Sequence, residues 1–261
     1  MSGPVPLAQA GDAERFGGKA AGLARALAAG LPVPDGLALP WDLVESWAED
    51  DGGALARLVA PLGAVAVRSS AVGEDGDRAS FAGQHATRLN VQALAAAAAL
   101  REVWQSARSP SALAYRQRLG IAGPPRMGVV IQPLVDAEVA GVLFTRNPVT
   151  GADERVIEAA FGLGEAVVAG LVTPDSFRLA RGGALLEARL GCKEIAVRPA
   201  EQGTREVSLA AADAPTLDER RLRQLDALAT ACEAAFGAAS DIEWAFAGDQ
   251  LYLLQCRRVT R

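Results

Sequence analysis

DIEWAFAGDQLYLLQCR, residues 241–257, has the pattern of a β-hairpin. Two runs of alternating side chains flank Gly248-Asp249, a dipeptide typical of tight turns between strands. Because side chains alternate between the two faces of a strand, one face should carry the apolar residues Ile242, Trp244, Phe246, Tyr252, Leu254 and Cys256. This register pairs the first three with the last three, predicts a loop of residues 248–250, and places Trp244 and Phe246 in the core.

The opposite face of the same hairpin is polar. The register places Asp241 opposite Arg257 and Glu243 opposite Gln255. Carboxylate and amide oxygens held on adjacent strands can bind a divalent cation, and a guanidinium can bind phosphate. The alternative is a salt-bridged face exposed to solvent, since exposed charge pairs are common and contribute little stability.

The composition of the whole chain limits the class of protein that it can be. The chain has 261 residues, is 50% hydrophobic and carries a net charge of -5, which favours a globular enzyme of one or two lobes. No basic run predicts nucleic-acid or membrane binding, and no apolar stretch or leader pattern predicts a membrane span or a signal peptide, so we expect a cytoplasmic protein. Three scattered cysteines and a single histidine, His85, favour neither a disulfide framework nor a zinc site.

Lys19 and Lys193 are the only lysines in a chain whose other basic residues are arginines. A lysine kept in such a sequence can be required as a compact point charge. The segment around Lys19, FGGKAAG, predicts a helix that has this lysine in its first turn, where backbone N–H groups favour anions. It is not a Walker loop, because Ala20 follows the lysine. Lys193 reads equally as a solvated strand residue or a phosphate ligand.

Further polar residues lie at the ends of expected strands. Arg68 ends the strand AVAVR, where its guanidinium can bind phosphate. A loop of small residues follows, in which Gly83 permits close approach of a ligand and Thr87 offers a hydroxyl. The alternative for this loop is an ordinary turn, with His85 incidental. Gln132 ends an apolar strand, where an amide can contact a base edge.

Helices and strands divide the chain near residue 125. Asn90 is expected to cap a helix from Val91 to about Ala107, and Thr216 with Glu219 to form a capping box for a helix that reaches Phe236. The run IAGPP, residues 121–125, is expected to join two lobes, residues 1–125 and 126–261.

Six blocks occur in this order along the chain: FGGKAAGLARALAAGLPVPDGLAL (16–39), VAVRSSAVGEDGDRASFAGQHAT (65–87), MGVVIQPLV (127–135), AGVLFTRNPVTG (140–151), VIEAAFGLGEAVVAGLVTPDSF (156–177) and DIEWAFAGDQLYLLQCRRVT (241–260). Together they resemble the nucleotide-binding domain of the phosphoenolpyruvate synthase and pyruvate phosphate dikinase family, which includes rifampicin phosphotransferase. The resemblance implies an α+β fold, a two-lobed ATP-grasp with the nucleotide between the lobes.

The resemblance also implies roles for single residues. It assigns ATP phosphates to Lys19, Arg68 and Arg257, the covering loop to Gly83 and Thr87, and the adenine end to Gln132. Glu243 and Gln255 are expected to hold Mg²⁺ as well as to contact ATP. Lys19, Arg68 and Arg257 are the expected catalytic residues.

The expected function is that of a stand-alone phosphotransferase subunit. The family's phosphate-carrying histidine domain is not found before Arg261, so the chain is expected to donate a phosphoryl or diphosphoryl group from Mg-ATP to a swivelling phosphohistidine domain on a separate polypeptide. That domain would then phosphorylate a small metabolite. The alternatives are a direct ATP-grasp kinase or ligase acting on a small molecule and a non-catalytic nucleotide-sensing module.

Overall fold

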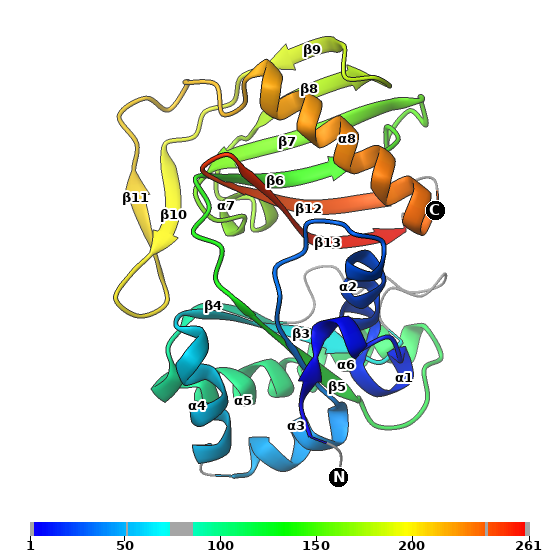
Figure 1. The fold of residues 1–261 in the computed structure, drawn as a ribbon, viewed down its shortest axis with the longest axis vertical. Helices are drawn as coiled ribbons and strands as arrows, with labels where there is room; N and C mark the ends of the chain where they lie inside the picture. Colours follow the sequence, from blue (N-terminus) through cyan, green and yellow to red (C-terminus); the bar gives the residue numbers. More distant parts are fainter. Residues whose placement is uncertain (1–2, 51, 74–85, 238–239, 259–261) are drawn as a thin grey trace.

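The computed structural model describes residues 3–50, 52–73, 86–237 and 240–258. Figure 1 shows two lobes, each built on its own β-sheet. This arrangement confirms the expected α+β fold with two lobes.

The N-terminal lobe contains a five-stranded sheet in the order β1 (Val5–Pro6), β2 (Leu37–Leu39), β5 (Met127–Pro133), β3 (Val65–Ala71) and β4 (Thr87–Val91). Its helices are α1 (Ala13–Phe16), α2 (Gly18–Ala28), α3 (Trp41–Ala48), α4 (Gly53–Val59), α5 (Ala96–Ser106) and α6 (Pro110–Arg118). Alternation along β3 places Val65 and Val67 in a core with α3, α4 and α5. Ala66, Arg68 and Ser70 therefore point to the other face, toward the second lobe.

The C-terminal lobe contains a six-stranded antiparallel sheet in the order β13 (Gln250–Arg258), β12 (Ser240–Ala247), β6 (Val139–Phe144), β7 (Glu154–Phe161), β8 (Asp175–Ala180) and β9 (Leu185–Arg189). The long helix α8 (Glu219–Phe236) covers one face, as Figure 1 shows, and the short helix α7 (Glu165–Val168) lies near the other. Arg155 is 1% exposed and pairs with Asp226 and Glu233 of α8. Apolar packing and this buried pairing both hold α8 on the sheet.

The boundary between the lobes follows from the strand order. β5 lies at the centre of the N-terminal sheet, between β2 and β3, although it begins at residue 127. The chain crosses to the second sheet only between Pro133 and Val139. We therefore propose that the lobes divide at residues 134–138 rather than at 125/126.

One apolar core joins the two lobes. It contains Leu23 of α2, Val130 of β5 and residues of α8 together with Trp244 and Phe246, both 0% exposed. The expectation that these two aromatic side chains are core residues is confirmed. Their rings meet edge to face, with centroids 5.6 Å apart.

A second connection between the lobes is polar. The ribbon of β10 (Ile195–Pro199) and β11 (Thr204–Ser208) extends from the C-terminal lobe toward β4 (Figure 1). At its turn, Asn90 Nδ2 donates hydrogen bonds to the carbonyls of Ala200 at 2.6 Å and Gly203 at 2.7 Å. Asn90 has a φ of 53°, a left-handed conformation that asparagine tolerates better than most residues.

Two expected helix caps are wrong. Asn90 lies in β4, and α5 begins at Ala96, because the asparagine side chain binds the ribbon turn instead of a helix N-terminus. α8 begins at Glu219 with Asp218 as its cap, whose carboxylate accepts from the Arg221 N–H at 2.7 Å. Thr216 instead binds the carboxylate of Asp175.

Candidate functional site

Five polar side chains from both lobes converge between the two sheets, and we call them the interlobe cluster: Lys19, Arg68, Gln132, Glu243 and Gln255. The first three come from α2, β3 and β5, and the last two from the hairpin of β12 and β13. Four of them are buried, and the Glu243 side chain is 33% exposed. Sequence positions more than 200 residues apart are thereby brought into direct contact.

Arg68 is at the centre of the cluster. Its Nη2 lies 3.1 Å from Glu243 Oε2, and its Nη1 lies 3.4 Å from Gln132 Oε1. The same Nη1 donates to the backbone carbonyl of Leu254 in β13. A guanidinium that is 9% exposed thus contacts three segments, and its fork has a fixed orientation.

The Leu254 carbonyl is accessible to Arg68 at a β-bulge. Glu243 lies opposite Gln255 as expected, but the register shifts at the next residue, and Trp244 lies opposite Leu253. The predicted pairing of Trp244 with Leu254 is therefore wrong, and Leu251 and Leu253, not Tyr252 and Leu254, join the core. A bulge leaves one residue without a partner in the ladder, which a strict period of two cannot foresee.

Lys19 lies at the second position of α2, in the first helical turn as expected. It is 8% exposed, and its ammonium donates a hydrogen bond to Gln255 Oε1. Because Gln255 faces Glu243 across the hairpin, Lys19 and Arg68 approach the same pair of oxygen-bearing side chains from the N-terminal lobe.

Gln132 and Thr87 flank Arg68 in the N-terminal sheet. Gln132 Nε2 donates to the carbonyl of Pro34 at 2.8 Å, so the amide is fixed with its oxygen toward Arg68. Thr87 lies directly opposite Arg68 in the ladder of β3 and β4, which puts both side chains on one face. Gly83, like His85, lies outside the described residues.

Arg257 belongs to the cross-strand pair next to that of Glu243 and Gln255 on the same face of the hairpin. Its Nε and Nη2 lie 2.9 Å and 2.6 Å from Asp241 Oδ2, and the two residues face each other in the ladder as the sequence predicts. Because Asp241 and Glu243 are two residues apart, Arg257 lies on the same face of the sheet as the cluster.

The donor set at the hairpin suits Mg²⁺ held jointly with phosphate. Within the described ranges, no group of three or more His, Cys, Asp and Glu side chains can hold a metal ion. Glu243 and Gln255 offer one carboxylate and one amide oxygen, which matches a cation bound by few protein ligands and completed by phosphate oxygens. These residues therefore fit a metal that arrives with a nucleotide.

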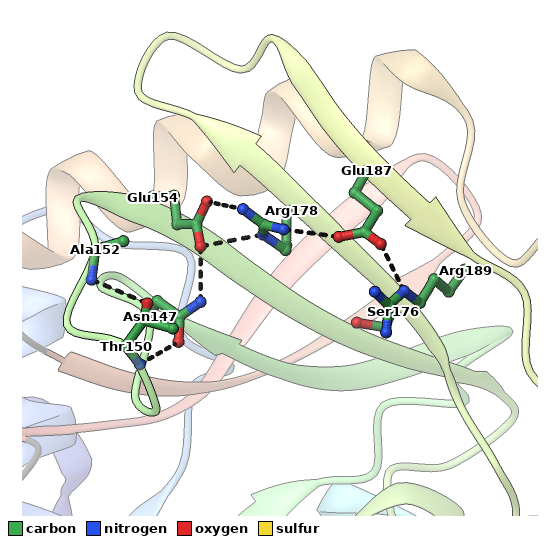
Figure 2. Close-up of a pocket in the computed structure, with 8 residues that line it drawn as sticks. All are labelled: Asn147, Thr150, Ala152, Glu154, Ser176, Arg178, Glu187 and Arg189. Atoms are coloured by element: carbon green, nitrogen blue, oxygen red, sulfur yellow. Dashed lines mark hydrogen bonds and ion pairs between the residues drawn. The ribbon is translucent and has the colours of Figure 1, made fainter.

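A different polar site, which the sequence did not single out, lies on β7, β8 and β9. A cavity of about 410 Å³ lies there. Arg178 lies between Glu154, at 2.8 Å, and Glu187, at 2.7 Å. Figure 2 shows this row of three charged side chains. The hydrogen bonds from Arg178 hold the pKa of both carboxyls below their ordinary value. The sequence does contain a signal for this site, because residues of opposite charge occur on the two strands that flank the turn at Gly182-Gly183. These charges neutralise each other, so the cavity is a weaker candidate than the interlobe cluster.

The expectation that Lys193 is a solvated strand residue is wrong. It is 0% exposed, and its ammonium binds Asp175, which is also 0% exposed. It lies outside any strand, and the same carboxylate accepts from Gly191 N and Thr216 N at 2.8 Å each. Lys193 is part of a buried structural network.

Comparison with known proteins identifies a family. The profile described as pyruvate phosphate dikinase, AMP/ATP-binding domain, matches residues 52–261, a range that begins after Lys19. An uncharacterized phosphotransferase of Bacillus subtilis, YvkC, is 34% identical over 275 residues, covering 94% of this chain and 33% of that protein. Rifampicin phosphotransferase of Streptomyces sviceus is 40% identical over 223 residues, covering 81% of this chain and 25% of that protein. The chain thus spans a third or less of the length of these relatives.

Among solved structures, N5-carboxyaminoimidazole synthase of Aspergillus clavatus aligns with 95% of this chain and 46% of its own, with a TM-score of 0.46 and 11% identity. Among the described residues, no helix combines the length and apolar character needed to cross a membrane.

Proposed function

Because the chain belongs to the pyruvate phosphate dikinase AMP/ATP-binding domain family, we propose that it binds Mg-ATP between its lobes and donates a phosphoryl or diphosphoryl group to a histidine on a separate polypeptide. The phosphorylated histidine domain then transfers the group to a small metabolite. The observation that carries the proposal is the interlobe cluster, in which Arg68 of one lobe contacts Glu243 of the other.

The chain's own residues bind and orient the nucleotide in this proposal. Lys19, Arg68 and Arg257 neutralise the phosphates, and Gln132 contacts the adenine end. Phosphoryl transfer requires chiefly positioning and electrostatic stabilisation from the protein, so no nucleophile in this chain is needed. Magnesium, when bound to Glu243 and Gln255, supplies further neutralisation of charge on the phosphate oxygens.

The contacts within the interlobe cluster support these roles. Lys19 binds Gln255 and Arg68 binds Glu243, so each cation is already directed at an oxygen of the hairpin. The guanidinium of Arg68 and the ammonium of Lys19 are both buried and hydrogen-bonded, which restricts their rotamers. Such preorganisation reduces the entropy lost when a ligand binds.

Nucleotide binding and product analysis test the proposal. The purified chain should bind ATP with Mg²⁺ in a calorimetric titration, and Glu243→Ala should abolish the magnesium dependence. With a histidine-domain protein added, diphosphoryl transfer should release AMP and label the histidine. If this chain alone modifies a small acceptor and releases ADP, the result would favour a direct kinase or ligase. If the chain binds ATP but forms no product, the result would favour a nucleotide sensor.

A further inference from the structure

The turn that carries Lys19 is fixed to β3 through Ser70. Ser70 is 0% exposed, and its Oγ accepts a hydrogen bond from the Ala20 N–H at 2.9 Å. Ala20 is the third residue of α2, whose N-cap position is occupied by Gly17. An N-cap side chain normally accepts from the second or third N–H of the helix, and glycine has no side chain to do so. Ser70 therefore supplies the missing cap from another strand.

Close backbone approach keeps this turn in place. Gly17 has a φ of 85°, and a Cβ at this position would lie 1.9 Å from the Ser70 carbonyl oxygen. A Cβ at Gly128 of β5 would lie 2.3 Å from the Phe16 carbonyl oxygen. Only glycine fits at both positions, so the turn rests directly on β3 and β5.

Ser70 also shares a strand face with Arg68. The two residues are two positions apart in β3, so their side chains point to the same side of the sheet. One stretch of β3 thus holds Arg68 itself and, through Ser70, the residue that follows Lys19. This strand thus connects the backbone positions of the two cations.

We propose that Ser70 is a positioning residue that fixes Lys19 relative to Arg68 for binding of the nucleotide phosphates. This inference rests on the proposed function, because it concerns the geometry of the same site. Ser70 acts through the hydrogen bond to Ala20 N and not by contact with the ligand.

A double-mutant cycle tests this role with Mg-ATP as the probe. Ser70→Ala should raise the Kd for Mg-ATP by about fivefold to thirtyfold, the upper part of the range that corresponds to losing a helix cap. In a Lys19→Met background, the same substitution should change Kd by less than about twofold, because Ser70 acts only through Lys19. Ser69→Ala removes a neighbouring buried hydroxyl on the other face of β3 and should leave Kd unchanged.

Melting temperatures separate this effect from unfolding. If Ser70→Ala does not fold, Ser70→Cys keeps the side-chain size but is a weak acceptor, and it should show the same loss of affinity. An equal loss in the parent and Lys19→Met backgrounds would make Ser70 a structural residue and overturn the proposal. Absence of Mg-ATP binding by the unmodified chain would instead reject the proposed function, and the role of Ser70 with it.

Discussion

Arg68 Nη2 lies 3.1 Å from Glu243 Oε2, so the two lobes each contribute one member of an ion pair. The two side chains differ in exposure, since that of Arg68 is 9% exposed and that of Glu243 is 33% exposed. Arg68 keeps its contacts to Gln132 and to the Leu254 carbonyl if the carboxylate is withdrawn. Glu243 is thus the more accessible member of the pair, and the neutral acceptors Gln132 and Leu254 bind the buried guanidinium from its other side.

The two faces of β12 should respond differently to substitution. Trp244→Ala removes a fully buried side chain and should lower the free energy of unfolding by about 3 to 5 kcal/mol. Glu243→Ala should leave the fold nearly intact and abolish magnesium-dependent binding of ATP. Chemical denaturation and calorimetry measure the two effects, and an equal loss of stability in both variants would contradict the assignment of faces.

The bond between Asn90 and the ribbon turn should contribute to stability. Asn90→Gly removes the two hydrogen bonds that the side chain donates and should lower the free energy of unfolding by about 1 to 3 kcal/mol. Asn90→Ala should cost about 1 to 2 kcal/mol more than glycine, because alanine is disfavoured at a φ of 53°. Urea unfolding of the three proteins gives this order. An alanine variant as stable as the parent would show that the ribbon turn does not depend on Asn90.

Alternation in the sequence predicted the hairpin correctly from Asp241 to Glu243 and failed from Trp244 onward. The reason is the bulge at Leu254, whose carbonyl accepts a hydrogen bond from Arg68, a residue 186 positions away. Lys193 was misread for a similar reason, since its burial depends on Asp175 in a different segment. Local patterns thus gave the strands and the polar face, whereas contacts distant in sequence decided which charges are buried.

Acid should remove the contribution of the Arg178 ion pairs. The hydrogen bonds from Arg178 and then Asn147 hold the pKa of Glu154 below its ordinary value of 4.5. A carboxyl whose pKa is lower in the folded state stabilises the fold above its unfolded pKa, and this contribution is lost as pH falls through the folded pKa. Arg178→Met should therefore lower the melting temperature at pH 7, and the difference from the parent should shrink below pH 4.5. A difference that stays constant down to pH 3 would contradict this account.

Removing Asp175 and removing Lys193 from their buried ion pair should lower the free energy of unfolding by different amounts. Asp175→Ala leaves a buried ammonium with the Gly191 carbonyl at 3.1 Å, and should cost about 3 to 5 kcal/mol. Lys193→Met should cost less, because Asp175 keeps its bonds from Gly191 N and Thr216. Denaturant unfolding measures both. If Lys193→Met preserves stability yet weakens Mg-ATP binding tenfold, Lys193 has a ligand role and not only a structural one.

Lys19→Arg tests whether the ammonium of Lys19 is required as a compact charge. Lys19 is 8% exposed and bonded to Gln255, so the larger planar guanidinium cannot occupy the same position unchanged. Loss of one phosphate contact of about 1.5 to 3 kcal/mol should raise the Kd for Mg-ATP by one to two decades, with little change in melting temperature. Arg118→Lys, an exposed swap in α6 that also conserves charge, is the control and should leave Kd unchanged. If Lys19→Arg binds within twofold of the parent, Lys19 does not contact phosphate, and the cap from Ser70 serves only to hold α2 against β3.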